Sequence, residues 1–575
     1  MTPIYEGVFI LVGALGLFLY ANSRFGDGIQ KVLGEKIRTS LENQAREPLS
    51  SVFTGILMAA LLQNNPMIFG MVSSLVNASL LGLFPALWIM LGASLGMTTT
   101  TQLMALNLAE VPYLLLFMGF LLYNFGKNRD WHHFGQVVFN LGLMYIGFHL
   151  FQEAFTVLIN ETESQRFLAA LFRNHWLGFL LGLSLAALFR GSNTIVVLVQ
   201  GIAAINLVAI TMSPSAGMEV LTGMMAIIIG AQVGTSITNL AISFDRLPAV
   251  QKVSWLYFLF NVTTALGWLL FLPRMVIMVE TISKGIHSGF VWFGMMVFKW
   301  DPAPFLLGNW FRIWELAMGY SVFCLTVILL WFPITVLSSK RGFGFSEKGK
   351  VNSNGVTYLD RRALQSPALA LILAGHEINQ MATIALEMLK SARLAFLKNQ
   401  VHLISSINRD ETIVDDLQEQ ITFYLSAILS QNSLTEAQSH RLAGLLHVVS
   451  DIERVGDHSH NIAHLAERKS QEQLPFSELA LNEIELFFGK SIDLYQKSGQ
   501  ALRDNNLELA KQVLNREENI DKLEEELRQN HIYRLNQGKC WPGSGVIYVE
   551  ILSNLQRVAA HAANIAAVVL EEGGE

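Results

Sequence analysis

Residues 55–101 read GILMAALLQNNPMIFGMVSSLVNASLLGLFPALWIMLGASLGMTTTT, and the chain contains this pattern twice. It recurs from Gly182 as GLSLAALFRGSNTIVVLVQGIAAINLVAI and, after an insertion, as MMAIIIGAQVGTSITN. In both copies a polar cluster begins eight positions after the opening glycine, at Gln63 and at Arg190. Each cluster is followed by an apolar run and then by a G-A-x-x-G sequence. The repetition predicts a domain built from two related halves.

Polar side chains, glycine and proline inside such apolar segments are costly when they face lipid, because hydrocarbon offers no hydrogen-bond partner. They are tolerated where they line a cavity inside the protein. Interrupted hydrophobic segments at matching positions of two halves are typical of secondary transporters whose site lies between the repeats. The alternative is that these residues only allow helices to pack closely. Because the two clusters stand in register, the sequence favours the transporter interpretation.

Composition divides the chain into a membrane part and a soluble part. Of the 575 residues, 52% are hydrophobic, and apolar runs dominate as far as about Lys340, after which charged residues occur every few positions. We therefore predict a membrane domain at 1–337, with repeats at about 1–130 and 131–337, a linker at 338–357 and a soluble domain at 358–575. The net charge of −6 provides no basic surface for nucleic acid, so no nucleic-acid partner is expected.

The flanking charges predict the orientation in the membrane. The apolar run from Ile4 to Tyr20 has no basic region before it and no cleavage site, so we interpret it as a retained membrane helix. Lysine and arginine residues follow it, and residues 29–41 are expected to form a separate amphipathic helix at the cytoplasmic surface. Basic residues in the linker indicate that the C-terminal domain is also cytoplasmic.

Cys324 and Cys540 lie in parts of different polarity, which favours a reducing compartment for the soluble part.

Beyond Ser366 the periodicity is helical. Apolar residues recur at spacings of three and four and strand signals are absent, which predicts an all-α bundle. This part is also duplicated, because IERVGDHSHNIA at 452–463 resembles LQRVAAHAANIA at 555–566. Two three-helix bundles are expected.

Together these motifs resemble a known family. The membrane part resembles the type II sodium/phosphate cotransporter family, which duplicates a Q-S-S-S-A-T-T motif, each copy followed by G-A-N-I-G-T-T. The C-terminal part is similar to the PhoU domain, with its E-R-I-G-D-H-a-x-N-I-A signature. The resemblance covers nearly the whole chain. It implies an all-α, polytopic membrane domain with inverted repeats and a PhoU-like helical domain, in the bacterial inner membrane. It further implies inorganic phosphate or a related anion as substrate, sodium as coupling ion and, by analogy, a homodimer.

The two membrane motifs depart from the family pattern. Gln63 matches the first glutamine, but Asn64, Asn65 and Pro66 occupy the serine positions, and Arg190 replaces the second glutamine. Phosphate requires hydrogen-bond donors and positive charge, and sodium requires oxygen ligands, which these polar residues still offer. The candidate substrate- or ion-binding residues are Gln63, Asn64, Asn65, Thr98, Arg190, Ser192, Asn193, Thr194, Gln232, Thr235 and Ser236.

Arg190 introduces a permanent charge into an apolar segment, and three interpretations remain open. In the first interpretation, Arg190 binds the oxyanion of the substrate in place of a sodium ion. Alternatively it pairs with an acid such as Glu153, Glu219 or Asp245 and closes the path, or it lies at the interface and extends to water. The first interpretation predicts reduced or absent sodium dependence.

The C-terminal part carries carboxylates spaced four residues apart, which lie on one helical face. In PhoU proteins such pairs are associated with iron or another hard cation, so the resemblance implies a divalent metal or iron in the first half of this domain. The candidate ligands are Glu411, Asp415, Glu453 and Asp457. In the second half Glu517 and Asp521 keep one pair, whereas Gln556 and Ala560 replace the other. The alternative is that these acids are solvated helix faces.

The sequence favours a secondary active transporter of inorganic phosphate or a related oxyanion, embedded in the lipid bilayer and regulated by a PhoU-like domain. No nucleophile arrangement, nucleotide-binding loop or zinc-protease motif occurs, so no enzymatic activity is expected. The alternative function is a membrane sensor or regulatory protein that keeps this scaffold without transporting.

Overall fold

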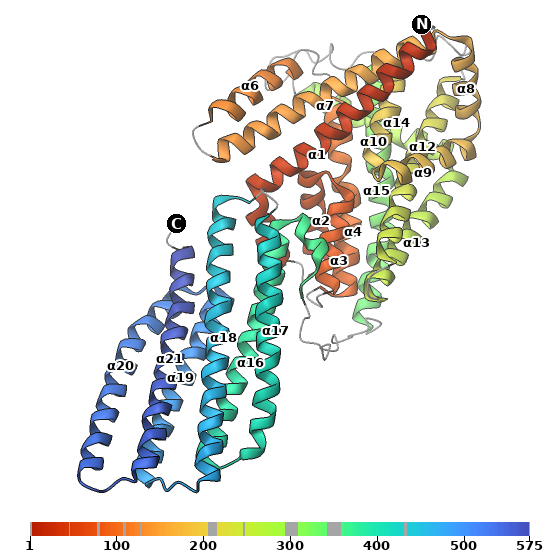
Figure 1. The fold of residues 1–575 in the computed structure, drawn as a ribbon. Coiled ribbons are helices and arrows are strands. Elements are labelled where there is room, and N and C mark those ends of the chain that lie inside the picture. The colour runs from red at the N-terminus through yellow and green to blue at the C-terminus, as the bar shows by residue number, and fades with distance from the viewer. Residues whose placement is uncertain are drawn as a thin grey trace. The chain divides into compact units, whose positions relative to one another are not determined.

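The computed structural model describes residues 3–44, 47–77, 81–106, 111–126, 129–204, 216–244, 248–293, 309–341, 358–430 and 434–573. The chain divides into two compact units, Met1–Lys348 and Gly349–Glu575 (Figure 1). Within the described ranges the secondary structure is helical and contains no strand, which confirms the all-α prediction. Residues 342–357 of the predicted linker lie outside these ranges.

The first unit contains the two sequence repeats. Its helices are α1 (Pro3–Gln44), α2 (Pro48–Leu62), α3 (Asn65–Asn77), α4 (Leu83–Gly96), α5 (Thr98–Met104), α6 (Val111–Phe125), α7 (Arg129–Ile159), α8 (Thr162–Arg173), α9 (His175–Phe189), α10 (Ser192–Ala203), α12 (Ala216–Ser243), α13 (Pro248–Leu270), α14 (Leu272–Phe293) and α15 (Asn309–Lys340). The duplicated sequence corresponds to duplicated packing, because α2 packs against α4 and α9 packs against α12. The first helices of the two repeats, α1 and α7, pack against each other (Figure 1).

Helix α1 differs from the prediction. The sequence suggested an apolar span and a separate surface helix, but residues 3–44 form one continuous helix. The glycines between the two predicted segments do not end the helix, because they allow close packing. A β-carbon on Gly26 would lie 3.3 Å from the carbonyl carbon of Leu62 and closer still to its oxygen, and one on Gly28 would lie 2.8 Å from Val137. Tertiary packing therefore overrides the local weakness of glycine as a helix former.

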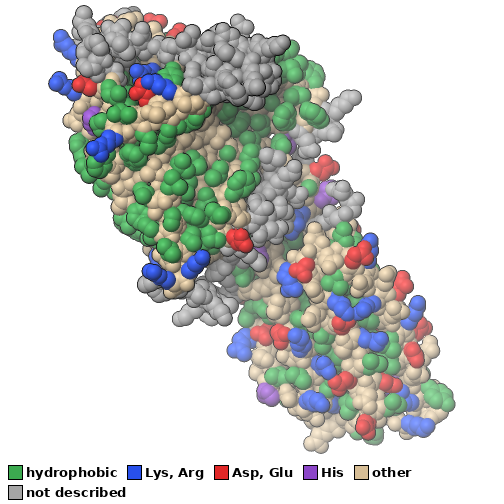
Figure 2. Space-filling view, turned by 180° about the vertical axis from the view of Figure 1, so that it is seen from behind, with side chains coloured by type: hydrophobic (Ala, Val, Ile, Leu, Met, Phe, Trp, Pro, Cys, Tyr) green, Lys and Arg blue, Asp and Glu red, His purple; other side chains and the backbone are tan. Residues whose placement is uncertain are grey.

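Six helices of the first unit are long and apolar enough to cross a membrane, counted over the described residues. The spans are Ile4–Val32, Leu83–Met104, Trp131–Ile159, Met218–Ser243, Pro248–Leu270 and Phe311–Lys340. Helices α8 and α9 meet the same test only as a pair, which is bent by 105°. Figure 2 shows a broad hydrophobic surface on this unit, bordered by charged side chains. These features are those of a multi-pass membrane protein.

The second unit is a helical bundle with its own core. It consists of a 3₁₀ turn at Arg361–Gln365 and the helices α16 (Pro367–Leu397), α17 (Ile404–Leu429), α18 (Glu436–Gln471), α19 (Glu478–Asp504), α20 (Leu507–Asn536) and α21 (Pro542–Gly573), with a short 3₁₀ turn at Val401–Leu403. Helices α16–α18 pack together, as do α19–α21, and the two groups join through α18 with α21 and α16 with α19. The two predicted three-helix bundles are confirmed.

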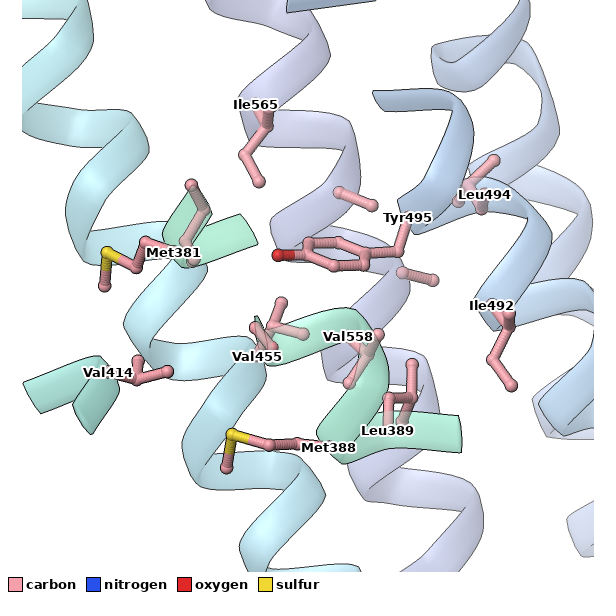
Figure 3. Close-up of a cluster of buried hydrophobic side chains, with 14 of the residues drawn as sticks. Met381, Met388, Leu389, Val414, Val455, Ile492, Leu494, Tyr495, Val558 and Ile565 are labelled. Atoms are coloured by element: carbon pink, nitrogen blue, oxygen red, sulfur yellow. The ribbon is translucent and has the colours of Figure 1, made fainter. Parts of the chain in front are cut away.

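Helix α16 is also apolar and long enough to pass the membrane criterion. However, its apolar face lies in the core of the second unit, with Met381 and Met388 fully buried. Figure 3 shows these methionines in one cluster with the ring of Tyr495 and with Val558. The hydroxyl of Tyr495 donates a hydrogen bond of 3.3 Å to the carbonyl oxygen of Ala382. The hydrophobicity of α16 therefore reflects burial among helices.

Candidate functional site

Each repeat contains a pair of short helices that meet at its polar cluster. Helices α2 and α3 have 15 and 13 residues, and α9 and α10 have 15 and 12. At 1.5 Å per residue none exceeds about 23 Å, which is less than the roughly 30 Å hydrocarbon thickness. The breaks occur at Gln63 and Arg190, which share the left-handed conformation with φ of 49° and 55°. The two clusters are therefore structurally equivalent interruptions between half-helices.

The glycines of the G-A-x-x-G sequences hold these half-helices against their partners. A β-carbon on Gly92 would lie 2.9 Å from the carbonyl carbon of Val52 in α2 and closer still to its oxygen. A β-carbon on Gly230 would lie 2.8 Å from the carbonyl carbon of Phe179 in α9, again with the oxygen nearer. Helix backbones are thus in direct contact at equivalent points of both repeats. For these glycines the packing interpretation is correct.

The cluster of the second repeat belongs to a buried hydrogen-bond network. The Ser192 hydroxyl, in the first turn of α10, lies 2.7 Å from the hydroxyl of Tyr320 and donates to Oε1 of Gln232 at 3.1 Å. The Tyr320 hydroxyl donates to the same Gln232 oxygen at 3.0 Å. Nε2 of Gln232 donates to Tyr257 at 3.2 Å and to Asn261 at 3.4 Å. The network joins α10, α12, α13 and α15.

The cluster of the first repeat makes mainly local contacts. Gln63 is only 2% exposed; its Oε1 accepts a hydrogen bond from Thr100, and its Nε2 donates to the carbonyl oxygen of Ala60 at 2.9 Å. Asn64 Oδ1 accepts from the backbone N–H of Met67 at 3.2 Å and thereby caps α3. Both side chains stabilise the break itself.

The two clusters approach the same face of α12. Asn65, in the first turn of α3, donates from Nδ2 to Oδ1 of Asn239 at 3.3 Å. Asn239 lies seven residues after Gln232, on the same face of α12 and about 10 Å farther along it. The first turns of α3 and α10, at Asn65 and Ser192, therefore both contact this face. Two buried amide nitrogens, Nδ2 of Asn193 and Nδ2 of Asn239, have no hydrogen-bond partner.

The remaining hydroxyl residues predicted for the site are buried. Thr98 donates to a backbone carbonyl of its preceding turn at 2.8 Å, Thr235 does so at 3.0 Å and Ser236 at 2.6 Å. A hydroxyl that donates to its own helix keeps its oxygen available as an acceptor. Thr194, in the first turn of α10, is also buried.

Arg190 is separate from the buried network. Its side chain is exposed, and no carboxylate of the described residues lies within ion-pair distance of it. Glu153 and Glu219 are themselves exposed, and Asp245 lies outside the described residues. An ion pair with either of the two described acids is therefore not formed. Its exposure is compatible both with binding of an anion and with extension to water.

Sequence reasoning missed several residues that complete this region. Thr100, Tyr257 and Tyr320 each hydrogen-bond a predicted glutamine but were not predicted. Gln200 was also missed; its Nε2 donates to the carbonyl oxygens of Thr101 and Ile313, at 3.0 and 3.2 Å. The seven-residue spacing between Gln232 and Asn239 was an available signal for Asn239, because it places both on one helical face.

A second candidate site lies in the C-terminal unit. Carboxylate oxygens of Asp415, on α17, and of Glu453 and Asp457, on α18, all lie within 4.8 Å of one another. Glu411, the fourth predicted ligand, contacts the ring of His460, with 3.1 Å between Oε1 and Nδ1. Burial and the neighbouring carboxylates raise the pKa of Asp415 and of Glu453 above their ordinary values. Three converging carboxylates of this kind fit a hard cation.

The equivalent position of the second half is arranged differently. Gln556 stands where the first half has Glu453, and its Nε2 donates to Oδ1 of Asp521 at 2.8 Å. Burial, followed by the charge of Asp521, raises the pKa of Glu517. An amide donor and Ala560 replace two potential ligands, so only two carboxylates remain here.

Comparisons with known proteins agree with this architecture. Residues 17–153 match the Na+/Pi-cotransporter family, and residues 378–466 and 484–569 match the PhoU domain. The chain thus combines an N-terminal segment similar to the Na+/Pi-cotransporter family with a C-terminal segment similar to the PhoU domain. The family match ends within α7, and the second repeat is evident from the duplicated helices.

Similar proteins extend over the whole chain or over its second unit. "Putative inorganic phosphate export protein YjbB" of Escherichia coli K12 is 21% identical over 98% of this chain and 98% of its own length. "Phosphate-specific transport system accessory protein PhoU homolog 1" of Thermotoga maritima is 24% identical over 35% of this chain and 85% of its own length. The crystal structure of PhoU from Pseudomonas aeruginosa covers 37% of this chain and 97% of its own, with 17% identity and a TM-score of 0.33.

Proposed function

We propose that this protein is a secondary active transporter that moves inorganic phosphate or a related oxyanion across the bacterial inner membrane. The observation that carries the proposal is that two half-helix N-termini, those of α3 and α10, contact the same face of α12, at positions about 10 Å apart along it. Helix N-termini present unpaired backbone N–H groups and a partial positive charge, which favour anions. Beside them, the unpartnered amide nitrogens of Asn193 and Asn239 offer further donors. These groups together suit an oxyanion.

The comparisons support phosphate as the anion and outward movement as its direction. Relatives that align over 98% of this chain carry the name of an inorganic phosphate export protein. We therefore propose that the anion enters from the cytoplasm and leaves on the opposite side. The PhoU domain, which follows the basic end of α15 at Lys340, is then cytoplasmic and senses or gates the transporter.

An ion gradient drives the movement in this proposal. The family description names sodium, but the serine hydroxyls that would hold it are replaced by Asn64 and Asn65 in the first motif and by Asn193 in the second. Their amide nitrogens are donors and repel a cation, whereas only the amide oxygens can bind one. We therefore propose weaker sodium dependence than in proteins with intact motifs.

The PhoU domain is proposed to bind a divalent metal or iron at Asp415, Glu453 and Asp457. Such an ion would neutralise the repulsion among these carboxylates, and Glu411 stands one turn away to assist. Elemental analysis of the purified protein tests this site: about one metal ion per chain is expected, and the D457N variant should lose it. An absence of bound metal in the native protein, after purification without chelator, would contradict the assignment.

Transport is tested with radiolabelled phosphate in proteoliposomes. Wild-type protein should exchange internal for external phosphate faster than protein-free liposomes. Asn193→Asp keeps the side-chain size but replaces the unpartnered donor with a negative charge, and should reduce exchange at least tenfold. Ser184→Ala, on the exposed face of α9, is the matched control and should exchange normally. Wild-type exchange no faster than in empty liposomes would refute transport and favour a sensor on the same scaffold.

A further inference from the structure

The membrane unit contains a buried acid that none of the motifs above includes. Glu315 lies in α15, inside the predicted span Phe311–Lys340, and is 0% exposed. Among the described residues of the first unit it is the one buried carboxylate. Arg312, one turn earlier and 42% exposed, donates from Nη1 to Oε2 of Glu315 at 2.9 Å. Ionisable residues at such positions are expensive and mark ion or proton pathways.

The second oxygen of this carboxylate, Oε1, has no hydrogen-bond partner. The hydroxyl of Ser283 on α14 is also fully buried and has no partner. A β-carbon on Gly319, one turn after Glu315, would lie 3.8 Å from Val279, and Ser283 follows Val279 by one turn on α14. Because residues that follow Val279 on α14 lie near residues that precede Gly319 on α15, the two helices run antiparallel and Ser283 lies at the level of Glu315. Lys284, next to Ser283, is close enough to interact with the charge of Glu315, as the register requires.

The charged groups around Glu315 are few. On its own helix the neighbour is Arg312, and on α14 it is the pair of Glu280 and Lys284, which form a 2.7 Å salt bridge with each other. Helices α4, α5 and α10, which also pack against α15, carry no charged residue. Helix α12 carries only Glu219, which is exposed, and α13 carries only Lys252 in its first turns. The carboxylate therefore has a single direct cationic partner among the described residues.

A buried carboxylate with one unpartnered oxygen is destabilised, because its desolvation is only partly offset by one ion pair. A proton bound at Oε1 removes the charge and converts the acceptor into a donor, for which Ser283 offers an oxygen. A sodium ion requires several oxygens and would lie beside the Arg312 guanidinium, which repels it. The surroundings therefore suit a proton better than a metal cation.

Glu315 is also connected to the oxyanion region through its helix. Tyr320, which belongs to the Ser192 and Gln232 network, lies five residues farther along α15, at a rise of about 7.5 Å. We propose that Glu315 binds a proton on its unpartnered oxygen during each transport cycle and thereby couples oxyanion movement to the proton gradient. Protonation releases Arg312 and lets α15 shift, and with it Tyr320. Deprotonation restores the ion pair. This inference rests on the proposed transport function.

The test uses the full-length protein in proteoliposomes and compares two measurements. The first is phosphate exchange at equal pH and equal phosphate on both sides. The second is net phosphate accumulation driven by an imposed pH gradient. Wild-type protein should show both. Glu315→Gln keeps the shape but binds no proton; it should keep exchange within about twofold and lose gradient-driven accumulation at least tenfold. Glu219→Gln, which removes an exposed acid on α12, should behave as wild type in both measurements.

The outcomes separate this inference from the proposed function. Absence of exchange in the wild type refutes transport itself. If exchange is present, gradient-driven accumulation by E315Q overturns the coupling role, as does accumulation in the wild type that follows only a sodium gradient. Loss of exchange as well as accumulation in a folded E315Q also overturns it. If E315Q does not elute as a folded protein, Ser283→Ala decides: it should shift the pH profile of accumulation, and an unchanged profile contradicts the proposal.

Discussion

The contact between α9 and α12 provides a prediction whose size follows from the structure. In Gly230→Ala the new β-carbon would lie 2.8 Å from the carbonyl carbon of Phe179 and 3.0 Å from its Cα. The carbonyl oxygen of Phe179 lies closer still, and because non-bonded atoms in contact prefer about 3.5 Å, the two backbones must separate by more than about 1 Å. Overpacking of this kind costs up to about 3 kcal/mol, and the higher helix propensity of alanine offsets about 1 kcal/mol. We expect a net loss of about 2 kcal/mol.

The same displacement should reduce transport. Helix α10 follows α9 directly, so it should move with α9. The hydrogen bond from Ser192 on α10 to Gln232 on α12 is 3.1 Å long, and a further separation of about 1 Å exceeds hydrogen-bonding distance. Misplacement of a binding group by such an amount commonly costs tenfold or more in rate. Phosphate exchange by G230A should therefore fall at least tenfold. Gly92→Ala, with the equivalent contact in the first repeat, should be destabilised to a similar extent.

Thermal unfolding of the detergent-purified protein measures the stability, and proteoliposome exchange measures the transport. Gly267→Ala on α13 is the matched control, because a β-carbon there meets no atom within 4 Å. It should leave exchange unchanged and the midpoint equal or slightly raised, whereas G230A should lower the midpoint by about 4 °C. A G230A protein as stable as G267A but inactive would refute the packing role and assign Gly230 to the ligand.

Three further predictions concern the other polar groups. Gln556→Glu replaces the amide that donates to Asp521 with a third carboxylate, so elemental analysis should find about one additional divalent ion per chain; unchanged stoichiometry would contradict this. Because the folded pKa values of Asp415 and Glu453 lie above the unfolded ones, the metal-free protein should lose stability as pH rises above about 4. Asp415→Asn should flatten this dependence in thermal unfolding. Ser192→Ala removes one buried hydrogen bond and should cost about 1 kcal/mol, measured as a lower unfolding midpoint and slower exchange.

Much of the second unit was predictable because its signals are local. Apolar residues at spacings of three and four marked helical structure beyond Ser366, and the structure has α16 at Pro367–Leu397. The acids at spacing four necessarily share a helical face, and three of them do converge. In the membrane unit, the helix breaks near Gln63 and Arg190 were predictable because they occupy matching positions in the two copies of the repeat. It was not predictable at residues 21–28, where packing against neighbouring helices keeps α1 continuous.

The sequence by itself determined the two repeats, the helical classes of both parts and the polar interruptions, because each of these depends on residues close together in the chain. Only the tertiary structure decided which polar groups meet. Asn65 and Asn239 are 174 positions apart, and Ser192 and Tyr320 are 128 apart. Such partners depend on how distant helices pack, and the same packing leaves Arg190 exposed and Glu315 buried. Local periodicity carries no information about either outcome.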